Sequence, residues 1–351
     1  MIGRSGFCLC LVVLSFILSL GNPKLVMFFP ARNSPFFLVF GALILVLPGC
    51  QSFDLAEIVA RNVIYEVQNP VQAPAARLEA PSRANPRSSN EIRAAWVGHS
   101  TVLLSFQNTF ILTDPVFSKR IKIARRVVSP PIEPGEIKYL DFILITHGHY
   151  DHLDLPSLKQ LPTNAVLIVP EGYKTLVDGL GFNVIELKWG EIFTSGSLTV
   201  EAFRPAHWGR RKPWDEDRGY NSYLLSKNGK TILFAGDTGP SKIFEEKGRG
   251  RDIVLSFLPI TAYKPEWFRR NHANPEEALQ MFRESGARYM IPIHWGTFIL
   301  SHEPMDEPVA RLKSEAKRLA IEDRVIILRH GELFTVPEQI LQHRAEKFTH
   351  F

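Results

Sequence analysis

A run of histidines and carboxylates directly after a buried strand constrains this chain more than any other feature. The run reads Thr146-His147-Gly148-His149-Tyr150-Asp151-His152-Leu153-Asp154, and it follows the apolar, β-branched residues 141–145, which predict a buried strand. A loop after a strand can turn these side chains toward one point, whereas a helix would spread them around its circumference. Imidazole and carboxylate are ligands of zinc and similar divalent ions. Four such groups exceed what one open catalytic metal needs from a single loop, so the spacing predicts two metals side by side. The alternative is a polar surface loop in which the histidines have no joint role.

Residues 1–50 are predicted to be a signal peptide or lipoprotein signal outside the fold. Residues 7–20 and 36–47 are apolar, and each run is short for a membrane span but suits the hydrophobic core of a signal peptide. The second run ends in Leu47-Pro48-Gly49-Cys50, which resembles the bacterial lipobox, whose cysteine becomes the lipidated first residue. We therefore expect an exported, membrane-anchored lipoprotein that faces the periplasm or the cell exterior and starts at Met1 or Met27. A plain membrane anchor with an incidental cysteine is the alternative.

Cysteine usage and charge restrict the site and its partners. The 351 residues contain three cysteines, Cys8, Cys10 and Cys50, and all lie in the predicted signal, so the metal site is limited to nitrogen and oxygen ligands. The formal charge of +5 is mild and dispersed and does not indicate a nucleic-acid partner. The sequence leaves the oligomeric state open.

The rest of the chain divides into three predicted parts. Residues 51–91 predict an N-terminal helix, to about residue 68, and a Pro-rich tether. Residues 92–335 predict the main folded domain, and residues 336–351 a C-terminal tail. No internal repeat is found.

Further candidate ligands follow predicted strands, as the metal loop does. His207 and His294 each come directly after such a strand, and either could instead be a structural histidine. Asp237 lies in Gly236-Asp237-Thr238-Gly239, where a carboxylate between glycines could approach two metals closely and bridge them; a simple turn is the alternative.

Three further features keep two interpretations each. His99 is either bonded within a turn or placed near the metals. Asp114 is either an acceptor for a ligand imidazole or a turn former. The basic loop 118–138 is either a solvated face or a rim for a phosphate-bearing partner or an anionic membrane.

The motif His147–Asp154, together with His207, Asp237 in Ala-Gly-Asp-Thr-Gly and His294 in Ile-His-Trp-Gly-Thr-Phe, resembles the metallo-β-lactamase superfamily. Within it, residues 92–335 resemble the N-acyl-phosphatidylethanolamine-hydrolysing phospholipases D and their bacterial relatives. The finer matches are Trp96-Val97-Gly98-His99, Leu112-Thr113-Asp114-Pro115, residues 262–268 and Pro275-Glu276-Glu277-Ala278. The chain departs from the vertebrate enzyme at Gly148, where that enzyme has asparagine.

The resemblance implies an α/β fold (α+β by some schemes), an αββα four-layer sandwich with two divalent metal ions. Zinc is the default ion, and iron or manganese would also fit the ligands. The resemblance assigns His147, His149 and His207 to one metal, Asp151, His152 and His294 to the other, and Asp237 to the bridge.

The resemblance also implies a phospholipase D-type phosphodiesterase acting on N-acyl-phosphatidylethanolamine-like lipids by attack of a metal-bound hydroxide on phosphorus. Asp151 would orient or deprotonate the water, and His272 or a metal-bound water would protonate the leaving alcohol; otherwise His272 is a surface imidazole. Tyr263, Trp267 and Phe268 would bind substrate, with Arg269 and Arg270 holding a phosphate or an anionic surface. The alternative is that Trp267 and Phe268 are core residues and the two arginines a solvated face. The alternative functions are a lactonase or another small-molecule hydrolase of the superfamily, and a non-catalytic metal-binding lipoprotein.

Overall fold

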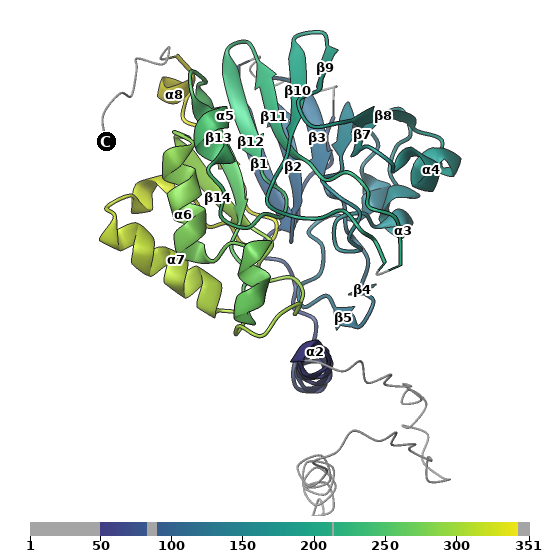
Figure 1. Cartoon of the computed structure of the whole chain (residues 1–351). Helices are drawn as coiled ribbons and strands as arrows, with labels where there is room; N and C mark the ends of the chain where they lie inside the picture. Colours follow the sequence, from purple (N-terminus) through teal and green to yellow (C-terminus); the bar gives the residue numbers. More distant parts are fainter. Residues whose placement is uncertain (1–49, 83–89, 213, 343–351) are drawn as a thin grey trace, which may run out of the picture. The chain divides into compact units, whose positions relative to one another are not determined.

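Two β-sheets packed face to face form the centre of the protein, with helices on their outer faces (Figure 1). The computed structural model describes residues 50–82, 90–212 and 214–342. The layer order is helix, sheet, sheet, helix, which confirms the predicted αββα sandwich.

The first sheet joins an antiparallel meander to a parallel half. Strands β1, β2 and β3 pair antiparallel in sequence, and β3, β6, β7 and β8 pair parallel. Because parallel strands point the same way, the residues that follow β6 emerge at one edge of the sheet. The spatial order is β15 (Leu333–Thr335), β1 (Ile92–Gly98), β2 (Thr101–Phe106), β3 (Thr109–Thr113), β6 (Phe142–Leu144), β7 (Val166–Pro170) and β8 (Asn183–Leu187).

The second sheet is built in a related way. The predicted hairpin at Asn228-Gly229 joins β11 to β12, and β12, β13 and β14 then pair parallel. Strands β10 and β12 both pair antiparallel with β11, so they also run in the same direction. The spatial order is β14 (Tyr289–Ile293), β13 (Ile253–Pro259), β12 (Lys230–Phe234), β11 (Ser222–Lys227), β10 (Leu198–Phe203) and β9 (Ile192–Ser195).

Three apolar clusters correspond to the three interfaces between layers. The central cluster lies between the sheets and includes Trp96, Phe106, Tyr223, Phe234 and Phe257. A second cluster packs the first sheet against α3 (Leu155–Leu158) and α4 (Lys174–Val177). A third packs the second sheet against α5 (Ile243–Gly248), α6 (Pro275–Glu284) and α7 (Glu307–Arg318). Burial on both faces explains the continuous apolar strands in the sequence.

Helix α6 begins as its sequence predicts. Asn274 caps it by accepting a hydrogen bond from the Glu277 amide, Glu277 returns one to the Asn274 amide, and Pro275 occupies the first turn. The remaining elements are α2 (Cys50–Gln68), β4 (Arg120–Ile121), β5 (Ala124–Arg125), η1 (Pro134–Glu136), η2 (Asp178–Leu180), η3 (Glu266–Arg270), η4 (Glu322–Arg324) and α8 (Glu338–Gln342). None of the described helices has both the length and the apolar character that crossing a bilayer requires.

The two ends of the domain differ from the predicted boundaries. Helix α2 confirms the predicted N-terminal helix, but the stretch after it is hydrogen-bonded to the domain: the Gln72 amide donates to the Val127 carbonyl and the Leu78 amide to the Pro131 carbonyl, both at 2.9 Å. At the other end, Val336 is buried and its amide donates to Ile92, so the domain continues past residue 335. The predicted signal covers residues 1–50, and all of it except Cys50 lies outside the described residues.

Candidate metal centre

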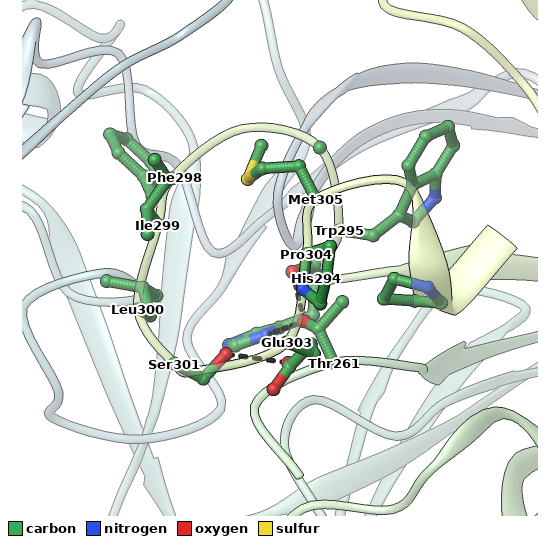
Figure 2. Close-up of a pocket in the computed structure, with 12 residues that line it drawn as sticks. Thr261, His294, Trp295, Phe298, Ile299, Leu300, Ser301, Glu303, Pro304 and Met305 are labelled. Carbon is green, nitrogen blue, oxygen red and sulfur yellow. Dashed lines mark hydrogen bonds between the residues drawn. The ribbon is translucent and has the colours of Figure 1, made fainter. Parts of the chain in front are cut away.

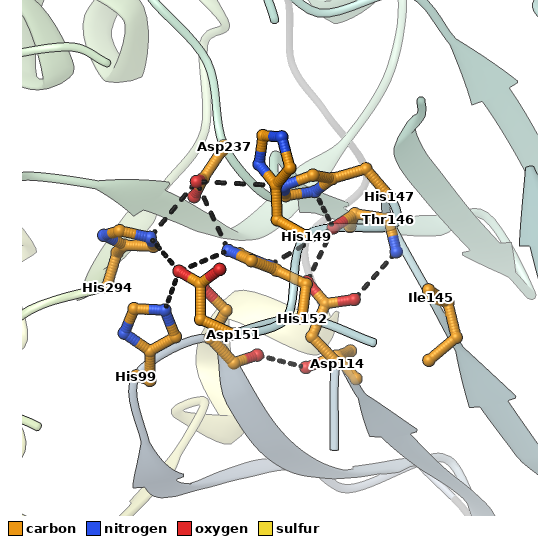
Figure 3. Close-up of polar contacts among 12 residues, drawn as sticks. His99, Asp114, Ile145, Thr146, His147, His149, Asp151, His152, Asp237 and His294 are labelled. Atoms are coloured by element: carbon orange, nitrogen blue, oxygen red, sulfur yellow. Dashed lines mark hydrogen bonds and ion pairs between the residues drawn. The ribbon is translucent and has the colours of Figure 1, made fainter. Parts of the chain in front are cut away.

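All seven predicted ligands meet at one edge of the sandwich, where strands of both sheets end. Figure 3 shows His147, His149, Asp151, His152, Asp237 and His294 around this centre. The metal loop follows β6 of the first sheet, and His207, Asp237 and His294 follow β10, β12 and β14 of the second. Strands that run in the same direction deliver their following residues to the same edge, which explains how positions 147 and 294 become neighbours.

The ligand atoms fall into two groups. One contains His147, His149, His207 and Asp237, and the other contains His99, Asp151, His152 and His294; within each group the ligand atoms lie within 4.8 Å of one another. In the first group, Nδ1 of His149 lies 2.9 Å from Nε2 of His147 and 3.2 Å from Nε2 of His207. Nitrogens placed tetrahedrally about 2.0–2.1 Å from zinc would be about 3.3–3.4 Å apart. The convergence of these nitrogens therefore fits a metal ion at their centre.

Asp237 lies between the two groups. Its Oδ2 atom is 3.1 Å from Nε2 of His294 and 3.3 Å from Nε2 of His152 in one group, and 3.9 Å from Nε2 of His207 in the other. The preceding Gly236 has a φ of +62°, and a Cβ atom there would meet the Thr146 side chain at 2.6 Å. Glycine at this position thus lets the end of β12 approach the metal loop closely enough for Asp237 to face both groups.

In four of the ligand imidazoles, Nδ1 forms a hydrogen bond to a hydroxyl, a carboxylate or a backbone carbonyl of the surrounding protein. Such bonds fix the ring orientation and leave the other nitrogen directed at a metal. The pairs are His147 Nδ1 with Thr146 Oγ1 at 3.0 Å, His152 Nδ1 with Asp114 Oδ2 at 2.7 Å, His207 Nδ1 with the Asn271 carbonyl at 3.0 Å, and His294 Nδ1 with Thr261 Oγ1 at 2.9 Å.

Electrostatics favour the metal-binding forms of several groups. Burial lowers the pKa of His147 and of His207 well below the usual value, so both imidazoles are neutral. Burial acts to raise the pKa of Asp237, but His152 and His294 outweigh it and hold that pKa well below its usual range. Burial likewise acts to lower the pKa of His294, yet Asp237 and Asp151 raise it to about 9. Metal binding releases such protons, because the ligand form of imidazole is neutral.

Several polar atoms at the centre are buried without a hydrogen-bond partner among the described residues. They include Nε2 of His152, Nε2 of His294 and Oδ1 of Asp237. Buried polar atoms are seldom left unsatisfied in folded proteins, and a metal ion would satisfy these three. The residues present therefore fit metal ions bound through nitrogen and oxygen.

The structure decides between the interpretations of His99 and Asp114. His99 is fully buried, and its Nε2 lies 2.9 Å from Oδ2 of Asp151, so it lies beside the second group of ligands. Asp114 accepts hydrogen bonds from the Thr146 amide at 2.7 Å and from His152, so it is an acceptor for a ligand imidazole.

The predicted proton donor and substrate contacts lie in different environments. His272 is buried with its Nδ1 3.7 Å from Oδ2 of Asp237, and burial lowers its pKa to about 4. The Phe268 ring lies 6.2 Å from the His272 ring, and Trp267 is 45% exposed. Tyr263 is only 2% exposed, and its hydroxyl bonds to Glu307 at 3.0 Å. Tyr263 therefore packs inside the domain, and its contact with substrate stays a prediction.

Arg269 and the basic loop, each of which kept two interpretations, make contacts within the protein. The Arg269 guanidinium pairs with Glu277 and Glu266, so it is already neutralised by the protein. In the loop, Arg126 is buried against the Val116 carbonyl, and Arg120 pairs with Glu66 at 2.6 Å. These side chains therefore hold the loop to the domain and to α2, and the exposed lysines of the loop are Lys119, Lys122 and Lys138.

Two side chains around the centre, Trp208 and Arg211, were not assigned a role by the sequence analysis. The Trp208 ring lies 4.7 Å from the His149 ring and 4.4 Å from the His207 ring and is 39% exposed. The Arg211 guanidinium lies 4.0 Å from the Tyr150 ring and donates to the Gly148 carbonyl at 2.7 Å. Trp208 could have been predicted to lie near the centre because it follows His207 directly. Nothing in the sequence indicates that Arg211 contacts Tyr150 and Gly148.

The packing around position 148 explains why the residue there is glycine. A Cβ atom there would overlap the ring of Tyr173, a buried residue whose hydroxyl donates to the Gly209 carbonyl. Tyr173 thus fills the space that a side chain at 148 would need.

The loop after β14 is fixed from two directions. The Glu303 carboxylate accepts from the Lys264 amide at 3.2 Å and from the Ser301 hydroxyl at 2.6 Å. Ser301 and Glu303 line a pocket beside His294 (Figure 2). From the outside, α2 donates to the same loop: the Asn62 amide reaches the Ile299 carbonyl at 2.9 Å, and Arg61 reaches the Ser301 carbonyl at 3.0 Å.

Comparison with known proteins shows the family to which this arrangement of ligands belongs. Residues 109–295 match the beta-lactamase superfamily domain. The chain is 33% identical over 296 residues to the mitochondrial N-acyl-phosphatidylethanolamine-hydrolyzing phospholipase D of Saccharomyces cerevisiae, covering 79% of this chain and 62% of the yeast protein. It is 32% identical over 252 residues to phospholipase D 1 of the same specificity from Caenorhabditis elegans, covering 64% of this chain and 70% of that one. The chain thus spans less than two thirds of the yeast relative.

Solved structures show the same fold at low identity. A metallo hydrolase from the archaeon Ignicoccus hospitalis superposes with a TM-score of 0.53 at 20% identity, covering 70% of this chain and 98% of that chain. An isothiocyanate hydrolase from Delia radicum gut bacteria superposes with a TM-score of 0.57 at 19% identity, covering 69% of this chain and 98% of that chain.

Proposed function

The chain belongs to the metallo-β-lactamase superfamily and is a metal-dependent hydrolase, and on that premise we propose that it is a binuclear phosphodiesterase acting on N-acyl-phosphatidylethanolamine-like phospholipids. The products would be phosphatidic acid and an N-acylethanolamine. One observation carries the proposal: Asp237 faces two separate groups of nitrogen and oxygen ligands, in a chain similar to relatives named for this reaction.

The proposed ligand sets follow from the geometry. His147, His149 and His207 would hold one ion, Asp151, His152 and His294 the other, and Asp237 would contribute to both. When bound, two divalent ions activate a shared water and stabilise charge on the phosphoryl oxygens.

Asp151 and His272 are the proposed proton-handling groups. Asp151 is held by Nε2 of His99 at 2.9 Å, which leaves the carboxylate positioned to accept a proton from water. His272 lies on the Asp237 side of the centre with a buried, unbonded Nδ1. Because burial lowers its pKa to about 4, His272 is neutral at pH 7. We assign it hydrogen-bond donation to the leaving oxygen, rather than delivery of a proton from an imidazolium.

Export and lipidation belong to the same proposal. The apolar run 36–47 and the ending Leu47-Pro48-Gly49-Cys50 support acylation of Cys50 and a periplasmic or external location. Intact-mass analysis of the membrane fraction tests this point. We expect a chain that starts at an acylated Cys50, and recovery of a chain that keeps residues 27–49 would contradict it.

A product panel tests the function. The full chain, loaded with zinc and analysed for metal, is incubated separately with N-acyl-phosphatidylethanolamine in mixed micelles, a water-soluble phosphodiester and a lactone, and the products are identified by mass spectrometry. We expect phosphatidic acid from the lipid, abolished by Asp237→Ala and retained by Asp154→Asn, which alters a buried carboxylate that binds only serine hydroxyls among the described contacts. Turnover of the lactone alone would favour the lactonase, and no turnover of any substrate would favour a non-catalytic metal-binding protein.

A further inference from the structure

Helix α2 presents a row of large apolar side chains to solvent. Ile64 and Val67 are 55% and 82% exposed, and Val63 and, just past the helix, Val71 are 39% and 42% exposed. Positions 63, 64 and 67 lie within a single face of a helix that turns 100° per residue. Soluble surfaces scatter such residues singly, so a row of four on one short segment needs an explanation.

The opposite face of α2 fixes which way this row points. Ile58 and Asn62 are 8% and 5% exposed, and the Asn62 side chain donates to the Ile299 carbonyl at 2.9 Å. Arg61 adds bonds to the Ser301 and Glu303 carbonyls, both at 3.0 Å. The inner face is therefore bound to the domain, and the apolar row is held outward.

The β4–β5 hairpin extends this surface toward the metal loop. Its two-residue tip is Lys122-Ile123, with Ile123 42% exposed. Its stem is tied to α2 by the Arg120–Glu66 pair at 2.6 Å, and Arg125 donates to the carbonyl of Asn69, just past the helix, at 2.6 Å. The Lys122 ammonium lies 3.7 Å from the centre of the Tyr150 ring. Tyr150 separates His149 from Asp151, so the tip of the hairpin contacts the metal loop itself.

We propose that the outward face of α2 and the Lys122–Ile123 tip together form a docking surface for the interface of an anionic phospholipid bilayer. This surface, the α2 face, consists of Val63, Ile64, Val67, Val71, Lys122 and Ile123. The choice of a lipid partner rests on two observations. The helix begins at Cys50, directly after the apolar run 36–47, and the apolar row is accompanied by exposed lysines at 119 and 122. Apolar side chains beside lysines suit the boundary between acyl chains and anionic headgroups.

The position of the α2 face also deepens the proposed function. If the substrate is a membrane phospholipid, its phosphate must reach the metal centre while its acyl chains stay out of water. The hairpin tip touches the metal loop, so a bilayer on the α2 face would lie next to the centre. This last step rests on the proposed function, whereas contact with lipid does not.

Lipid contact is tested directly by fluorescence quenching. Val67→Trp is introduced into the full chain, and Ile192→Trp serves as the matched control, because Ile192 is 59% exposed on β9. Both are reconstituted with vesicles of phosphatidylglycerol and phosphatidylcholine, with and without brominated acyl chains, and the parent chain's signal is subtracted. We expect bromine to reduce the added fluorescence of Val67→Trp at least about twofold and to leave that of Ile192→Trp unchanged, since bromine quenches only a ring that reaches the acyl chains. No quenching at position 67, or equal quenching at both positions, would overturn the proposal.

A second measurement separates this inference from the proposed function. Ile64→Gln with Val67→Gln removes the apolar row but keeps the helix, because glutamine is at least as good a helix former as isoleucine or valine. We expect turnover of vesicle phospholipid to fall about tenfold and turnover of a water-soluble phosphodiester to stay within about twofold, because only the first requires docking. Quenching at position 67 without turnover of any substrate would support lipid docking by the α2 face and contradict the proposed phosphodiesterase activity. Equal loss on both substrates, or a dimer of the parent chain that the double substitution dissociates, would contradict docking to lipid.

Discussion

The carboxylate of Asp114 accepts a hydrogen bond from Nδ1 of His152 at 2.7 Å, and both side chains are fully buried. This bond links the end of β3 to the metal loop after β6 and directs Nε2 of His152 toward Asp237 at 3.3 Å. The sequence left Asp114 open between this role and that of a turn former, and the structure shows the first.

Asp114→Asn should weaken metal binding. Asparagine keeps the size of the side chain but removes the negative charge that orients and polarises the imidazole, and losses of such partners typically cost about 10–100-fold in metal affinity. Titration with a competing chelator measures the affinity. Asp154→Asn is the control, since Asp154 is also a buried carboxylate but accepts from Ser118 and Ser157. Equal affinities in the two variants would show that the bond to His152 does not support the metal.

Asp237→Ala should disturb both ions. Its Oδ2 atom faces ligands of both groups, so its removal takes a ligand from each. His207→Ala, by contrast, removes a ligand from one group only. Elemental analysis should give near-complete loss of metal in the first variant and about one ion per chain in the second, given a pair of ions with a shared carboxylate. Two ions retained at full occupancy in Asp237→Ala would refute the bridging assignment.

Asn62→Ala should loosen the loop that follows His294. The substitution leaves the Ile299 carbonyl without its side-chain partner, which costs about 1–3 kcal/mol when the group is buried. The same loop carries Glu303, whose carboxylate accepts from the Ser301 hydroxyl and the Lys264 amide. Lys264 is three residues after Thr261, whose hydroxyl bonds to Nδ1 of His294. We therefore expect lower stability in thermal unfolding together with reduced metal occupancy. Asn69→Ala is the matched control, because the Asn69 side chain, just past α2, donates to the Tyr65 carbonyl of that helix and not to the loop. If metal occupancy in Asn62→Ala equals that in the control, α2 does not contribute to the centre.

Gly148→Ala should destabilise the protein through one identifiable overlap. The added Cβ atom would meet the Tyr173 ring, and overpacking of this kind costs about 1–3 kcal/mol. Tyr173→Leu alone should also destabilise, because it loses the hydroxyl bond to the Gly209 carbonyl. The double variant should lose less free energy of unfolding than the two single variants lose in sum. Denaturant unfolding of the parent, the two single variants and the double variant measures this difference. Strict additivity would mean that the two positions do not contact.

How far the sequence predicts the site depends on whether a residue carries a local signal. His147, Asp237 and His294 follow strands, and a strand end is readable from apolar periodicity and glycine. The location of His99 was open because its contact with Asp151 spans 52 positions and carries no pattern of its own. The burial of Tyr263 was not predictable, because an aromatic residue close in sequence to His272 can point into the core or toward a site.

The ends of the domain were misjudged for a related reason. The prolines at 70, 74 and 81 break secondary structure and so resemble a tether, yet backbone bonds from Gln72 and Leu78 hold the stretch on the domain. Such pairing depends on the partners at Val127 and Pro131, which composition does not disclose. The apolar face of α2 was likewise unassigned, because only the folded contacts of Asn62 show which side is outward.

Hydrolysis in water enriched in ¹⁸O tests the central claim most directly. The metal-loaded chain is incubated with N-acyl-phosphatidylethanolamine, and both products are analysed by mass spectrometry. Attack of water on phosphorus, with departure of the ethanolamide alcohol, predicts one ¹⁸O atom in the phosphate of phosphatidic acid and none in the N-acylethanolamine. Label in the N-acylethanolamine, or in a released fatty acid, would contradict a two-metal phosphodiesterase built around Asp237.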